Sequence, residues 1–125
     1  MNCPTFILKL GVGLSFSAVP RSVHFKSLKV LHVSIDRPNN DLAQNLFSNC
    51  PVLEDLFILG NVESDEELVF DVSVPALKNF KFLLAGEEYK VLVDAPILEY
   101  LSVQNVWMPS YVLKNVTSLI DMLIK

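Results

Sequence analysis

The stretch Pro96–Val103, PILEYLSV, indicates the fold because its spacing recurs along the chain. In Pro51–Ile58 and Pro75–Phe82, as in Pro96–Val103, a proline is followed by apolar residues two, five and seven positions later. Lys26–Val33 and Thr117–Ile124 keep the apolar spacing without the proline. Five segments of the chain therefore share one template.

A sixth segment, Phe6–Leu10, fits the template if one residue is missing between Phe6 and Leu8. The first apolar residue of each segment, here called its lead residue, then recurs every 21 to 25 residues. A period of about 20–29 residues with an L-x-x-L-x-L core is typical of leucine-rich repeats. The lead residues are Phe6, Leu28, Leu53, Leu77, Leu98 and Leu119.

Each template predicts a short β-strand, because its last two apolar residues, such as Leu56 and Ile58, lie two positions apart and share one face. A single unit cannot bury that face, whereas stacked units bury it against each other and pair their strands in parallel. We therefore predict an α/β leucine-rich-repeat solenoid slice of about six units with a parallel concave sheet. It forms one domain over residues 1–125 and is expected to be truncated at both ends.

The segments between the templates predict a convex side of mixed short helix, strands and loops. Asp41–Ser48 has the apolar spacing of a helix. Leu68–Val72 and Tyr89–Val93 contain β-branched and aromatic residues in short runs, which favour strands. Trp107–Val112 is expected to be a loop, with a short helical turn around Tyr111–Lys114 as an option.

Composition and charge argue against nucleic-acid and membrane partners. The chain has 10 basic and 14 acidic residues and a net charge of −4, without a basic block. No stretch approaches the roughly 18 uncharged apolar residues of a membrane span. Phe6–Pro20 is apolar like a signal peptide, but Lys9 interrupts it and no positive charge precedes it, so a strand followed by a loop is favoured.

The two cysteines predict a reducing environment. Cys3 and Cys50 each precede a template, two units apart. A strand spacing of about 4.8 Å would separate them by roughly 9–10 Å, beyond the roughly 7 Å that a disulfide spans. We therefore expect two free thiols and an intracellular location, cytoplasmic or nuclear.

The sequence contains no pattern typical of an active site or a metal centre. It lacks a Ser-His-Asp nucleophile elbow, a phosphate-binding loop and paired redox cysteines. His24 and His32 lie eight positions apart without further ligands, and the acidic run Glu63–Glu67 lacks the spacing of a calcium loop. We predict a protein that is not an enzyme and takes no cofactor or metal.

The residues between the buried strand positions are predicted to line the concave face, which solenoids commonly use for binding. Phe57 and Tyr100 are the expected anchors, because aromatic residues dominate interface energetics. The alternatives are a solvated sheet face without a partner and a face covered by neighbouring domains. The candidate partner-binding residues are His32, Asp55, Phe57, Asn79, Lys81, Tyr100 and Ser102, and the same positions of other units hold Lys9, Val30, Asp121 and Leu123.

Three segments resemble one protein family in the identity of their residues as well as in their spacing. Phe25–Val33, FKSLKVLHV, resembles the F-P-S-L-K-x-L-H-L segment of plant F-box proteins. Leu46–Leu56, LFSNCPVLEDL, resembles their L-L-S-x-C-P-V-L-E-D-L, and Asp94–Leu101, DAPILEYL, resembles their D-A-P-x-L-E-Y-L. The resemblance covers nearly the whole chain and is specific to plant F-box/FBD/LRR-repeat proteins.

The resemblance implies a protein–protein interaction module that recruits a substrate to an SCF-type E3 ubiquitin ligase. Nothing in Met1–Asn40 matches the L-P-D-x-L-L-type opening of an F-box, and no FBD domain follows the last template. The implied partner is thus an unknown protein substrate, with a ligase adaptor only if a full-length form contains an F-box. The alternative is a truncated paralogue without a ligase role, either a decoy or a non-functional fragment.

Overall fold

The nine β-strands in the described part of the chain form two parallel sheets. The computed structural model describes residues 5–9, 28–37, 40, 43, 47, 50–62, 67–86, 89–104 and 110–124. Six strands form the larger sheet, in the order β1-β2-β3-β5-β7-β9, and three form the smaller, in the order β4-β6-β8. Their bounds are β1 Thr5–Lys9, β2 Val30–Asp36, β3 Asp55–Asn61, β4 Leu68–Ser73, β5 Asn79–Ala85, β6 Tyr89–Asp94, β7 Tyr100–Gln104, β8 Ser110–Lys114 and β9 Asp121–Ile124.

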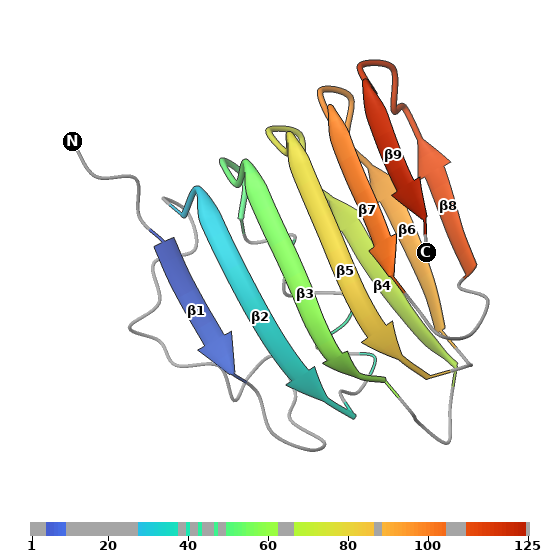
Figure 1. Ribbon diagram of the computed structural model, residues 1–125. Helices are drawn as coiled ribbons and strands as arrows, with labels where there is room; N and C mark the ends of the chain where they lie inside the picture. Colours follow the sequence, from blue (N-terminus) through green and yellow to red (C-terminus); the bar gives the residue numbers. More distant parts are fainter. Residues whose placement is uncertain are drawn as a thin grey trace.

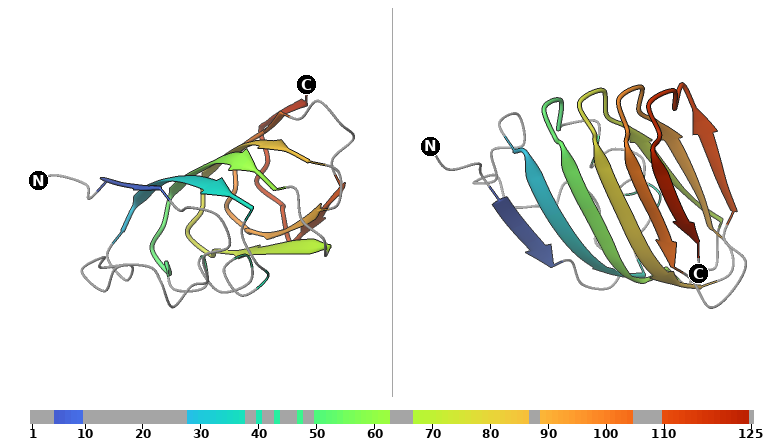
Figure 2. Two further views of the ribbon diagram at one scale, coloured as in Figure 1. Left: turned by 90° about the horizontal axis from the view of Figure 1, so that it is seen from below. Right: turned by 45° about the horizontal axis from the view of Figure 1, so that its top comes forward.

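The chain winds between the two sheets as a parallel β-solenoid of leucine-rich repeats. Three turns, β3–β4, β5–β6 and β7–β8, place one strand in each sheet. The smaller sheet lies behind β5, β7 and β9 (Figure 1). In the left view of Figure 2 the two sheets form separate layers. This architecture confirms the predicted leucine-rich-repeat solenoid with a parallel sheet and strands on both sides. It corrects the predicted α/β class and the count of about six units, because every element among the described residues is a strand and the two-sheet solenoid has about three turns.

The proline of the template lies in a tight turn that leads into each strand. In the third unit the Leu53 amide donates to the Cys50 carbonyl at 3.2 Å, across Pro51. Proline suits the second position of such a turn, because its ring fixes φ near the required value. The same bond recurs from Leu77 to Val74 and from Leu98 to Ala95, at 3.2 and 3.1 Å.

Hydrogen bonds between neighbouring turns hold the units in register. The amides of Glu54 and Asp55 both donate to the Lys29 carbonyl, at 2.8 and 3.0 Å. In the next unit the amides of Lys78 and Asn79 donate in the same way to Glu54. Because this link repeats at the start of successive strands, each template meets its neighbour position by position.

The apolar template positions form one continuous core between the two sheets. Along β5 the side chains alternate strictly between exposed and buried, as a half-buried strand requires. The lead residues Leu53, Leu77 and Leu98 are fully buried at the turns. No charged or polar side chain is buried among the described residues, so apolar packing dominates the core.

The pairing of β1 with β2 corrects the predicted register of the first unit. Phe6 pairs with Leu31 and Leu8 with Val33, so Phe6 holds the middle apolar position, not the lead. Lys9 pairs with Ser34, and Ile7 occupies the position opposite His32 that was assigned to Lys9. No residue is missing, because Phe6 and Leu31 are 25 positions apart, like Leu28 and Leu53.

The convex side agrees with the predictions in two segments and differs in a third. The extended segments expected at 68–72 and 89–93 are β4 and β6. The helical turn suggested for Tyr111–Lys114 is wrong, and so is the loop expected over the last residues of Trp107–Val112, because Ser110–Lys114 form β8 and pair in parallel with β6. The helix predicted over Asp41–Ser48 falls mostly outside the described residues and stays a prediction, although Ala43 and Phe47 of its apolar stripe are buried.

A single asparagine covers one edge of the smaller sheet. The Asn40 side chain donates to the Glu67 carbonyl and accepts from the Val69 amide, both at 3.0 Å. Its amide group thereby satisfies the Val69 amide of β4 and the carbonyl of Glu67, the residue just before β4, so the start of this edge is protected. Such protection disfavours unwanted pairing at an exposed strand edge.

Candidate partner-binding site

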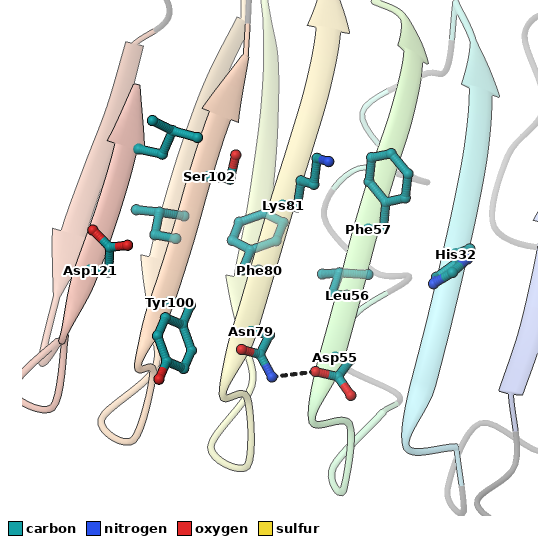
Figure 3. Close-up of a pocket in the computed structure, with 12 residues that line it drawn as sticks. His32, Asp55, Leu56, Phe57, Asn79, Phe80, Lys81, Tyr100, Ser102 and Asp121 are labelled. Atoms are coloured by element: carbon teal, nitrogen blue, oxygen red, sulfur yellow. Dashed lines mark hydrogen bonds between the residues drawn. The ribbon is translucent and has the colours of Figure 1, made fainter. Parts of the chain in front are cut away.

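The six-stranded sheet has one face turned away from the core, here called the open face, and this face is hollowed. A hollow of about 410 Å³ lies across β2, β3, β5, β7 and β9. Its lining includes all seven residues predicted for the concave face, and Figure 3 shows them projecting from neighbouring strands. These residues are His32, Asp55, Phe57, Asn79, Lys81, Tyr100 and Ser102.

Strand register arranges these side chains in two rows that cross the sheet (Figure 3). Alternate residues of a strand lie on the same face, so β3, β5, β7 and β9 each contribute one side chain to each row, and β2 contributes only to the upper row. The upper row consists of His32, Phe57, Lys81, Ser102 and Leu123, which pair in that order. The lower row consists of Asp55, Asn79, Tyr100 and Asp121, which also pair in order.

Phe57 is the fixed centre of the upper row. The His32 ring meets it edge to face, with the ring centroids 5.7 Å apart and the planes at 78°. On the other side the Lys81 ammonium lies 5.2 Å from the Phe57 centroid, within reach of a cation–π interaction. Phe57 therefore has a neighbour on both sides in the upper row, one aromatic and one cationic.

The lower row combines acidic and aromatic side chains. Asn79 donates a hydrogen bond to the Asp55 carboxylate, which fixes both side chains. Tyr100 is 46% exposed, which is high for an aromatic residue in a sheet. The Asp121 carboxylate is exposed and makes no hydrogen bond or ion pair with the described residues. The row thus offers an aromatic surface next to an available negative charge.

Sequence reasoning found the rim of the hollow but not its full extent. Asp121 and Leu123, which strand alternation predicts on the concave face, line the hollow together with the seven candidate residues. Leu56, Phe80 and Leu101 also contribute, although they were interpreted as core residues alone. Strand alternation alone predicts that Asp121 and Leu123 face the hollow. The contribution of Leu56, Phe80 and Leu101 follows only from the three-dimensional shape of the sheet.

The described residues contain no group of three or more His, Cys, Asp or Glu side chains that could hold a metal ion. Among the same residues, no helix is long and apolar enough to cross a membrane.

Cys50 is a buried thiol, and burial raises its pKa from the usual 9.0 to about 11. Because the folded pKa is the higher one, the thiol's contribution to stability is full below pH 9 and is lost as the pH rises toward 11. The thiolate is the reactive form, and a pKa two units higher makes it about a hundredfold scarcer at pH 8.

We expect Cys50 to react with an aromatic disulfide reagent at pH 8 at least about a hundredfold more slowly in the folded chain than in urea. A Cys3→Ser background isolates the signal, since Cys3 and Cys50 are the two cysteines of the chain. Equal rates in the folded and unfolded chain would contradict the burial of Cys50.

Comparisons with known proteins give one consistent result. A family model described as "FBD-associated F-box protein At5g56370, LRR repeats" matches residues 1–120. The Arabidopsis thaliana F-box/FBD/LRR-repeat protein At5g22670 is 40% identical over 106 residues, which are 77% of this chain and 24% of the relative. The F-box/FBD/LRR-repeat protein At1g78750 from the same plant is 33% identical over 126 residues, covering 96% of this chain and 27% of the relative.

The matches concern only part of the longer proteins. The chain spans about a quarter of the length of the curated relatives it matches. No solved structure matches the chain. The family assignment therefore rests on the sequence comparisons, and the geometry of the open face comes from the structure of this chain itself.

Proposed function

Since the chain belongs to the plant FBD-associated F-box/LRR-repeat family, whose leucine-rich-repeat region it matches, we propose that its open face binds a protein partner. The observation that supports this proposal most is the hollow of about 410 Å³, which gathers all seven candidate residues. It combines exposed aromatic, apolar and charged side chains, the mixture typical of protein interfaces.

Two aromatic residues are expected to contribute most of the energy with which this surface binds a partner. Tyr100 is exposed in the lower row, and Phe57 is held between His32 and Lys81 in the upper row. Large aromatic side chains are enriched among the few residues that dominate the affinity of an interface. A partner that covers the hollow would contact both, because they lie on β3 and β7 with only β5 between them.

The more specific proposal is that this partner is a substrate of an SCF-type ubiquitin ligase. The relatives are named as F-box proteins, and an F-box implies a ligase adaptor as the second partner of a full-length form. In that arrangement the open face selects the substrate and the F-box provides the link to the ligase. We further propose that this takes place inside the cell, in the cytoplasm or nucleus.

The ligase proposal is tested on the natural full-length gene product. We expect its affinity capture from native tissue to recover a cullin and its adaptor together with additional proteins. Recovery of the natural product without cullin or adaptor would contradict the ligase role. It would instead support the decoy interpretation, in which the repeats bind the same partner without leading to ubiquitination.

The interaction itself is tested with a matched pair of variants. Tyr100→Ala removes the exposed anchor from the open face, whereas Val112→Ala removes an apolar side chain, 38% exposed, from β8 of the smaller sheet. We expect Tyr100→Ala to reduce capture of a specific protein by at least about tenfold, and Val112→Ala to leave it unchanged. Equal capture by both variants would contradict binding at the open face.

A further inference from the structure

We propose that the lower row of the open face binds an arginine side chain of the protein partner. Its guanidinium stacks on the Tyr100 ring and pairs with the Asp121 carboxylate. The inference rests on the proposed function, since it names the chemistry that the same surface recognises. It begins from two exposed side chains that strand pairing places side by side.

Tyr100 and Asp121 are direct neighbours across β7 and β9, where they form the first pair of that ladder. Adjacent strands lie about 4.8 Å apart, so one planar group can reach both the ring and the carboxylate. Both side chains line the hollow and project from the same face of neighbouring strands (Figure 3). Both are also exposed, so no other part of the described structure occupies the place of a ligand.

The charges around the hollow favour a cation at this end. The other carboxylate of the lower row, Asp55, already accepts a hydrogen bond from Asn79. The cation of the upper row, Lys81, lies over Phe57 and not beside Asp121. Asp121 therefore has no partner of opposite charge among the described residues, and a positive group from a binding protein would supply one.

Arginine fits this pair better than lysine. Its guanidinium is planar and stacks on aromatic rings, and its fork of N–H donors matches both oxygens of a carboxylate. An ammonium group would supply the charge but neither the flat surface nor the paired hydrogen bonds. Leu123, which is 46% exposed, lies two residues beyond Asp121 on the same face, so the arginine should be flanked by an apolar residue.

The inference is tested by measuring which octapeptides of a library bind to the 125-residue chain. In each part of the library, one position is held as one defined amino acid, and every position and amino acid is covered in turn. We expect the chain to select arginine at one position by about tenfold over glutamate, and to prefer it clearly to lysine. Asp121→Asn, which keeps the size of the side chain, should abolish the arginine preference. Asp71→Asn on β4 is the matched control and should retain it.

Tyr100→Leu separates stacking from charge: it should reduce the preference for arginine over lysine and leave the preference for a cation in place. Peptide selection without an arginine preference, or a preference that survives Asp121→Asn, would overturn the inference. A library that yields no arginine-dependent binding would overturn it as well. The proposed function fails separately, if Tyr100→Ala leaves protein capture unchanged.

Discussion

Replacing Leu53 by alanine is expected to lower the free energy of unfolding by about 2–5 kcal/mol. Leu53 is the lead residue of the third unit and is completely buried. Its amide closes the turn that starts at Cys50, so the side chain enters the core where the chain turns into β3. Truncation would leave a cavity between two stacked units, and both would lose packing.

Denaturant unfolding followed by circular dichroism measures this loss. Val52→Ala is the matched control, because Val52 is the preceding residue of the same turn and is 38% exposed. That variant should stay within about 0.5 kcal/mol of the parent chain. If Leu53→Ala were as stable as Val52→Ala, the position assigned to the lead residue of the repeat would be wrong.

Gly60→Ala is expected to destabilise the chain by about 3 kcal/mol or more, although it adds only one methyl group. Gly60 has a φ of +151°, a conformation that residues with a side chain rarely adopt. A Cβ atom there would lie 1.9 Å from the carbonyl oxygen of Ile35. That oxygen belongs to the backbone of the paired strand β2, so the ladder itself would have to move.

The damage from Gly60→Ala should be localised to the end of the β2–β3 pair. Hydrogen exchange should therefore show faster opening of the amides near Ile35 and Asn61 than of those in β6 and β7. Leu59→Ala is the matched control, since Leu59 precedes Gly60 and is 40% exposed. Equal stability of Gly60→Ala and Leu59→Ala would show that the close approach to Ile35 is absent in solution.

The part of the fold that was predictable from sequence is the part with strong local signals. The proline turn and the spacing of apolar residues both lie within one short segment, as in Pro51–Ile58 and Pro96–Val103. Each of β2, β3, β5, β7 and β9 begins two residues after its predicted lead residue. A proline that presets the turn and an alternation that selects the buried face are enough to define such a strand.

The predictions that proved wrong concern segments where the local signal is weak. Phe6–Leu10 fits the template only with one residue missing, and pairing with β2 gives its actual register. Tyr111–Lys114 is short enough to form a helical turn or a strand, and the edge of β6 decides for the strand. In both cases, pairing with a neighbouring strand outweighs local preference.

The candidate site was also predictable only in part from the sequence. Strand alternation predicted which residues face away from the core, because this depends only on the period of a strand. The contacts of Phe57 with His32 and Lys81 and the hollow beside them depend on the register between strands. Register follows from the hydrogen bonds between turns, and these cannot be derived from the spacing within one repeat.

Site-specific photo-cross-linking tests most directly whether the open face is the binding surface. A benzophenone amino acid is placed at Tyr100 in one variant and at Val112, in the smaller sheet, in another. After irradiation in an extract of native tissue, we predict a cross-linked protein from position 100 that is absent from position 112. The same cross-linked proteins from both positions, or a product from position 112 alone, would contradict binding at the open face.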